Sequence, residues 1–287
     1  MTFEQDGLAG LGWDGHLLLL HGSEAERRTQ VAEWVQWGLE RDEQVIYGQD
    51  DTIADGQDDT IEPHRSVLAV LGEHGIDVQT ATAEGRLLVL PPNALYGAGT
   101  NGLMTRIECA LAEGYRAVRT SGEVSAARTG APEEVYPGLA YGLEWLCRTQ
   151  PVSALCQYEH TSTVGTRLEQ ATAAHVGGIR EAQLHTAETR DGLLLAGEVD
   201  ASNELVLLSA VQAASSIAVA VLWLDLRRVA FLNVGGCRAL AVGTQRFRER
   251  GGRVVLLVSE GIVARAVRLV ELDALMKVEL VELMETA

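Results

Sequence analysis

Residues 231–237 read Phe231-Leu232-Asn233-Val234-Gly235-Gly236-Cys237 and lie between an apolar run, Val219 to Leu226, and an amphipathic run, Gly236 to Arg250. The first run predicts a buried strand and the second a helix. Asn233 is suited to cap that helix, because its side-chain oxygen can accept a hydrogen bond from a free amide of the first turn. Gly235 and Gly236 let another surface approach closely. The stretch therefore predicts an exposed helix start that is suited to docking.

Strand and helix patterns alternate on both sides of this stretch. Short apolar runs predict strands at 16–21, 44–47, 86–90, 115–120, 152–158, 193–199, 254–258 and 278–281. Helical patterns fill most of the intervals, at 23–39, 62–74, 102–113, 133–147, 205–215, 236–250 and 262–272. Such alternation is typical of an α/β fold with a mostly parallel sheet flanked by helices. Small and polar residues between Ala171 and Asp191 predict a linker or a first edge strand.

The composition restricts the class of protein. The chain has 287 residues, of which 47% are hydrophobic, so it can form two domains with separate cores. The net charge is −17, which disfavours nucleic acid as a partner because phosphate backbones are repelled. No window approaches the roughly 20 apolar residues of a membrane span, and the start lacks a signal-peptide pattern. Four scattered cysteines predict reduced thiols. We expect a cytoplasmic protein.

The central stretch, with Gly197-Glu198-Val199-Asp200 upstream, resembles the STAS domain of anti-sigma factor antagonists. In that family an aromatic-hydrophobic-Asp-Ser-Ser-Gly pattern ends a strand, and a kinase-like anti-sigma factor phosphorylates the first serine. Asn233 lies where the resemblance puts the Asp, Val234 where it puts the phosphorylated Ser, and Gly235 where it puts the second Ser. Phosphorylation at this position is therefore not expected, since valine has no hydroxyl.

Residues of about 10–175 resemble the MEDS domain, a sensory module thought to be related to RecA-like ATPases. The pieces that carry the resemblance include 43–47, 85–90, Arg119-Thr120-Ser121-Gly122-Glu123 and Leu155-Cys156-Gln157-Tyr158. After the first strand the family tends to carry His-x-Cys-x-x-Tyr, whereas this chain keeps only the histidine, His21. We therefore expect a RecA-like domain at residues 1–180 and a smaller STAS-like α/β domain at residues 181–287.

In a parallel sheet, ligands bind beyond the carboxyl ends of the strands. That rule selects His21, Gln49, Glu123 and His160, each at or just past a predicted strand end. Arg119 is added as a partner of Glu123, either shaping a pocket or holding a ligand, and Tyr158 completes the set. The ligand implied by the resemblance is a small organic molecule. The partner site is predicted at Asn233, Val234, Gly235, Gly236 and Arg238.

Other motifs are given structural interpretations. The Gly-Gln-Asp-Asp-Thr-Ile repeat at 48–53 and 56–61 is interpreted as a duplicated solvated loop, because it lacks the ligand spacing of a calcium loop. No phosphate-binding Gly-x-x-x-x-Gly-Lys-Ser/Thr motif occurs. Cys156 with His160, or these two with Cys147, could form a thiolate pair or a metal site. However, their spacing matches no compact zinc module. We expect no catalytic residue, metal ligand or cofactor.

The leading hypothesis is a non-enzymatic signalling regulator, in which a small-molecule sensor controls a domain that binds an anti-sigma factor or a related kinase-like protein. Two alternatives stay open. One is a metal- or thiol-dependent sensor or enzyme in the first domain, with the second as a dimerisation scaffold. The other is a structural decoy in which both domains are degenerate. A homodimer is compatible with each, and neither nucleic acid nor a membrane is expected as a partner.

Overall fold

The apolar run His16–His21 forms β1, and all six of its residues are buried, as expected for a parallel strand covered on both faces. The computed structural model describes residues 11–48, 67–91, 94, 99–123, 136–276 and 279–283. The chain forms two compact units. Residues 13–162 make up the amino-terminal unit, and residues from 163 onward, with Leu11 and Gly12, belong to the carboxyl-terminal unit.

In the amino-terminal unit the described strands follow the order β1-β5-β4-β2-β3, and all neighbours are parallel. The remaining strands are β2 Gln44–Gly48, β3 Leu87–Leu90, β4 Val118–Glu123 and β5 Val152–Glu159. The helices are α1 Glu24–Leu39, α2 Val67–Glu73, α3 Val78–Ala83, α5 Gly99–Ala112 and α7 Tyr136–Thr149, and a short 3-10 helix spans His160–Ser162. The predicted parallel α/β fold is confirmed here.

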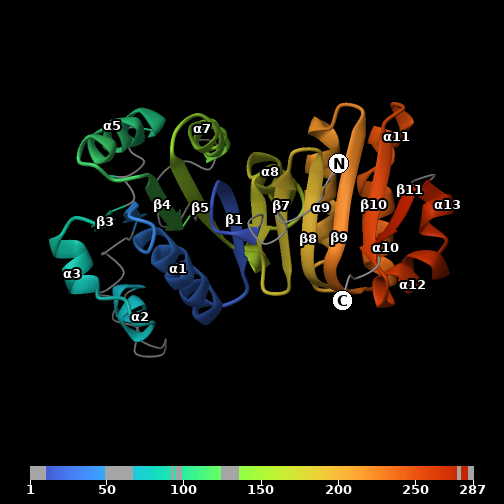
Figure 1. Cartoon of the computed structure of the whole chain (residues 1–287), viewed down its shortest axis with the longest axis horizontal. Helices are drawn as coiled ribbons and strands as arrows, with labels where there is room; N and C mark the ends of the chain where they lie inside the picture. Colours follow the sequence, from blue (N-terminus) through green and yellow to red (C-terminus); the bar gives the residue numbers. More distant parts are fainter. Residues whose placement is uncertain are drawn as a thin grey trace. The chain divides into compact units, whose positions relative to one another are not determined.

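The two faces of this sheet carry different helices (Figure 1). Leu17 and Leu19 of β1 pack with Val31 and Trp34 of α1 in one core cluster. Alternate strand residues point to the opposite face, where His16 meets Glu144 of α7. An apolar stripe along α1 is buried throughout, at Val31, Trp34, Val35, Gly38 and Leu39.

The carboxyl-terminal unit has the strand order β11-β10-β9-β8-β7-β6 among its described residues. Strands β8 to β11 are parallel, while β7 is antiparallel to both β6 and β8. The strands are β6 Gly178–Arg180, β7 Leu184–Thr189, β8 Gly192–Val199, β9 Val221–Leu232, β10 Arg253–Ser259 and β11 Glu279–Leu283. The helices are α8 Thr166–Ala174, α9 Glu204–Ile217, α10 Val234–Gly243, α11 Gln245–Glu249, α12 Ile262–Leu269 and α13 Leu272–Met276.

The helix predicted at 236–250 is two helices, which corrects the sequence interpretation. Helix α10 ends at Gly243, Thr244 caps it, and α11 begins at Gln245. The Thr244 hydroxyl donates to the carbonyl of Leu240 at 2.8 Å, and such back-bonding bends helices. The division separates the exposed start of α10 from the basic α11.

The linker or edge strand predicted between Ala171 and Asp191 contains two strands, β6 and β7, which form an antiparallel pair. The calcium-loop alternative and Gln49 lie outside the described residues. Of the helices that are described, none is long and apolar enough to cross a membrane.

Candidate functional site

A network of buried polar side chains lies at the carboxyl ends of the amino-terminal strands. Arg27 of α1, 6% exposed, donates from Nη1 to Tyr47 Oη at 3.1 Å and to Gln157 Oε1 at 2.9 Å. Gln157 Nε2 donates to Ser121 Oγ at 2.8 Å. Arg27 Nη2 donates to Glu24 at 2.7 Å. The network joins α1 to β2, β4 and β5 through hydrogen bonds that satisfy the buried guanidinium.

Sequence reasoning missed Arg27, although a signal was present. Arg27 precedes Val31 by four residues and thus falls on the apolar stripe of α1. A charged residue on a core-facing stripe needs buried partners. Its partners Tyr47 and Gln157 lie at the ends of predicted strands, where the ligand site was expected.

The first turn of α1 is closed by its own side chains. Ser23 Oγ accepts from the amide of Glu26 at 3.2 Å, and the Glu26 carboxylate accepts from the amide of Gly22 at 2.8 Å. Ser23 is therefore the N-cap of α1. A helix start with free amides binds phosphate readily, but here a carboxylate accepts the amide of Gly22. This agrees with the missing phosphate-binding motif.

The predicted ligand residues lie in different places. His21 ends β1, is 4% exposed, and is in register with Glu159. Tyr158 is also buried, but it falls on the opposite face of the sheet because strand residues alternate. Glu123 ends β4, and His160 begins the turn after β5. The strand-end rule thus selects residues near one edge of the sheet, but His21 and Tyr158 lie on opposite faces, and a ligand site at this edge stays a prediction.

Arg119 requires a correction. Its buried guanidinium contacts Glu43, Asp14 and the carbonyl of Trp13, and lies 5.5 Å from the centre of the Trp34 ring. These three contacts precede the starts of β2 and β1, so Arg119 points toward the amino-terminal edge. The Arg119 side chain packs closely against Gly38 of α1. A side chain at position 38 would clash with it, because a Cβ there would lie 2.5 Å from Arg119 Cδ. Arg119 is therefore part of the structural core and does not line the carboxyl edge.

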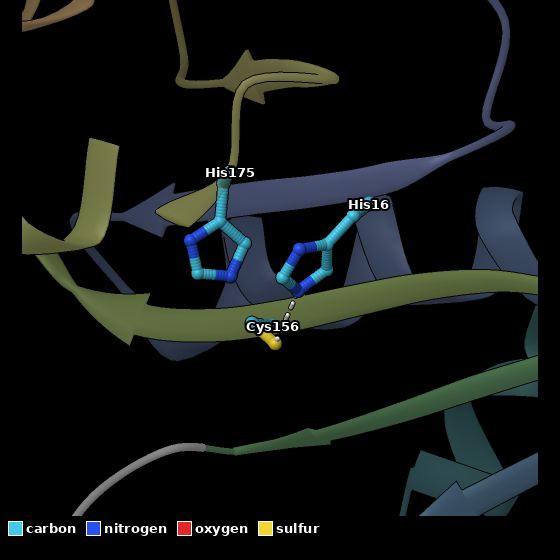
Figure 2. A group of neighbouring side chains, drawn as sticks. All are labelled: His16, Cys156 and His175. Atoms are coloured by element: carbon cyan, nitrogen blue, oxygen red, sulfur yellow. Dashed lines mark hydrogen bonds between the residues drawn. The ribbon is translucent and has the colours of Figure 1, made fainter. Parts of the chain in front are cut away.

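The thiol interpretation also changes. Cys156 Sγ lies 3.5 Å from Nε2 of His16, and Figure 2 shows the two side chains facing one another. His16 Nδ1 lies 3.1 Å from Oε2 of Glu144. The histidine partner of Cys156 in this unit is thus on β1 rather than at position 160. Sequence reasoning could not find this pair, because 140 residues separate its members.

The electrostatics keep the thiols neutral. Burial raises the pKa of Cys156 to about 12, and burial, followed by Glu144 and Cys156, raises the pKa of Cys147 further. For Glu144, burial favours the neutral acid, but hydrogen bonding to His16 and then Arg148 lowers its pKa below the usual value. Cys156 thus lacks the lowered pKa that an unaided nucleophile needs.

Two hollows lie outside the predicted sites. One, of about 520 Å³, is lined partly by β3 and α5 of the amino-terminal unit and includes Gln44 and Cys109. The other, of about 620 Å³, lies in the carboxyl-terminal unit, with α9 and α11 contributing most of its lining. Among the predicted ligand and partner residues that the structure describes, none lines either of these two hollows.

The predicted partner residues gather at the start of α10. Asn233 Oδ1 accepts from the amide of Gly236 at 2.6 Å, as the sequence predicts. Val234 is 69% exposed, and Arg238 is exposed one turn later. Gly236 is buried, and a Cβ there would lie 2.5 Å from Leu232 Cδ1. Gly236 therefore holds the helix start close to the sheet, while Val234 faces outward.

The neighbouring helix starts extend this surface. Strands β8, β9 and β10 are parallel, so their carboxyl ends and the helices that follow share one edge. Leu205 at the start of α9 is 60% exposed, Ile262 at the start of α12 is 59% exposed, and Phe231 is 40% exposed. Together with Val234, these exposed apolar side chains lie at or near the helix starts of this edge, and we call them the helix-start patch: Leu205, Phe231, Val234 and Ile262.

Hydrogen bonds from the buried side chain of Asn203 hold the loop before α9 in place. Asn203 is fully buried, and its Oδ1 accepts from the amide of Asp200 at 3.1 Å, while Nδ2 donates to the carbonyl of Glu198 at 3.0 Å. Gly197 has a φ of +99° at an irregularity in the pairing of β8 and β9. The Gly197–Asp200 motif thus shapes the loop beside the helix-start patch.

Comparisons with known families cover both units. The family described as MEDS, MEthanogen/methylotroph, DcmR Sensory domain, matches residues 15–176. The STAS domain family matches residues 186–283. No curated protein matches the chain. The families divide between residues 176 and 186, while the compact units divide at 162/163. The boundary predicted at 180/181 stays a prediction.

Proposed function

Because this chain belongs to the MEDS family and carries a STAS domain in its carboxyl-terminal part, we propose that it is a non-enzymatic cytoplasmic regulator that docks on a partner through the helix-start patch. Sensory and STAS domains are typically regulatory modules. The partner is an anti-sigma factor or a related kinase-like protein, and the MEDS domain responds to a small organic ligand. The observation that carries the proposal is the exposed Val234 at the capped start of α10.

The chemistry of the patch favours a stable contact over a phosphorylation switch. Its apolar side chains can be buried by a partner, and exposed apolar clusters mark interaction surfaces. Val234 offers no hydroxyl to a kinase. We therefore assign regulation to ligand binding or to packing between the domains, in agreement with the sequence interpretation. A homodimer remains compatible with this function.

The ligand site that we propose is the carboxyl edge of the MEDS sheet. His21, Glu123, Tyr158 and His160 remain its candidates from the sequence. Arg27 joins them because it bonds to β2 and β5 there, and its partner Gln157 bonds to β4. Ligand binding that replaces one of these hydrogen bonds changes how α1 is held against the sheet. This gives the sensor an element whose position a ligand can alter.

A capture experiment tests the partner. The intact chain and a Val234→Glu variant are used as baits in lysate of the native host, and the captured proteins are identified by mass spectrometry. Glutamate at this position suits the helix start, because negative charge near an amino terminus is stabilising, so the fold is preserved. We expect a kinase-like anti-sigma factor on the intact chain and at least tenfold less on Val234→Glu.

Leu269→Glu is the matched control, because Leu269 is 84% exposed at the end of α12 and outside the patch. It is expected to capture as much partner as the intact chain. Gly235→Arg is a less specific test, because any side chain at position 235 would also displace Glu204. A Cβ there would lie 1.8 Å from Glu204 Oε2. The proposal is wrong if no kinase-like protein is captured, or if Val234→Glu captures it equally well.

A further inference from the structure

We propose that His16 and Cys156 are two ligands of one thiophilic divalent metal ion, such as Zn²⁺, in the MEDS domain. The coordinating atoms are His16 Nε2 and Cys156 Sγ, which face one another in Figure 2. The proposal goes beyond the docking function and does not depend on the partner. It concerns residues that the expected ligand site does not include.

The separation of the two atoms fits a shared ion. A zinc ion lies about 2.0–2.1 Å from a histidine nitrogen and about 2.3 Å from a thiolate, and a tetrahedral angle then places the two ligand atoms about 3.5 Å apart. The observed separation of Nε2 and Sγ is 3.5 Å. A metal ion can thus enter between them without displacing either strand.

The partner of the second ring nitrogen supports the same assignment. Histidines that bind metals usually donate their other N–H to a carboxylate, which fixes the ring and leaves a lone pair on the coordinating nitrogen. Here His16 Nδ1 lies 3.1 Å from Glu144 Oε2, and Arg148 Nε in turn donates to Glu144 Oε1. With the proton on Nδ1, the lone pair on Nε2 faces Cys156 Sγ.

The strand register explains why the pair forms. His16 is in register with Ala154, and Cys156 lies two residues further along β5 on the same face of the sheet. Both side chains are nearly inaccessible, at 1% and 3% exposure. Binding would replace the Cys156 thiol proton: Zn²⁺ and the thiol give a zinc thiolate and one released proton. Two positions of a tetrahedral ion are left for other donors.

The test measures metal on the full chain. Protein is produced in medium supplemented with zinc or cobalt and is gel-filtered in the presence of a mild chelator, and the metal content is measured by mass spectrometry. We expect about one ion per wild-type chain. The cobalt form is expected to show a near-ultraviolet charge-transfer band from thiolate to metal, and loss of this band in Cys156→Ser assigns the thiolate to Cys156.

Variants then assign the ligands. Cys156→Ser and His16→Ala are expected to lose at least nine-tenths of the metal, and Glu144→Gln to bind it about 10–100-fold more weakly. Cys109→Ser and Cys237→Ser are controls, because Cys109 is exposed and Cys237 belongs to the other unit. Circular dichroism checks that each variant is folded.

Three results overturn the proposal. They are a wild-type chain with no retained metal, a cobalt form without the thiolate band, and equal metal content in the ligand variants and the controls. The first result would mean that the pair is only a buried thiol–imidazole hydrogen bond. None of these results bears on the partner capture, so the two proposals can fail separately.

Discussion

Arg119 is a fully buried cation whose position depends on charged partners. Its guanidinium binds Glu43 and Asp14, and Glu43 has a side chain that is only 5% exposed. Removing one member of such a pair leaves an uncompensated charge in the core. The sequence left two roles open for Arg119 beside Glu123, shaping a pocket or holding a ligand, whereas its burial and its partners Glu43 and Asp14 assign a structural role.

We predict that Arg119→Met lowers the free energy of unfolding by about 3 kcal/mol, because the buried carboxylate of Glu43 then keeps only its longer, 3.4 Å contact with the partly exposed Arg41. The double variant Arg119→Met/Glu43→Leu is expected to recover part of this loss. Arg116→Met is the control, since Arg116 is exposed in the same unit. Urea denaturation followed by circular dichroism measures the difference. An Arg119→Met loss no larger than that of the control contradicts the structural role.

At the scale of single residues, the sequence predicted positions better than partners. The Asn233 cap and the Ser23 cap follow from local spacing and were predictable. Cys156 and His16 meet through the pairing of β1 with β5, which local patterns do not specify. Arg27 was predictable as a buried charge, but its contact with Gln157 depends on the same tertiary pairing.

At the scale of elements, the buried strands were the most predictable part. The predicted strand at 16–21 has the same bounds as β1, because six consecutive residues are covered on both faces. Helix α3 was missed since it is short, and only the Asp77 cap on Thr80 signals it. The break at Thr244 was missed because the apolar periodicity continues through it.

Helix α10 depends on a glycine at its base. We predict that Gly236→Ala destabilises the STAS domain by about 1–3 kcal/mol, because the new methyl group would overlap Leu232 and Val199. Gly138→Ala in α7 is the matched control, since a Cβ there meets nothing within 4 Å. The control is expected to be neutral or stabilising. Thermal unfolding compares the two, and equal shifts would contradict the close packing of the α10 start.

At the scale of the whole molecule, the order of families was predictable, since both resemblances depend on short motifs in sequence order. The residues at which the two compact units divide could not be predicted from the sequence. Helix α8 falls within the MEDS match but is assigned to the carboxyl-terminal unit. Its contact with α9 involves residues distant in sequence, so no local composition change marks that boundary.

Binding of a kinase-like partner to the helix-start patch is measured by calorimetric titration of the purified full chain with the purified anti-sigma factor. We predict saturable binding that Val234→Glu weakens at least 30-fold, equivalent to about 2 kcal/mol, and that Leu269→Glu leaves unchanged. Absence of binding by the wild-type chain, or equal affinity for wild type and Val234→Glu, would contradict the account.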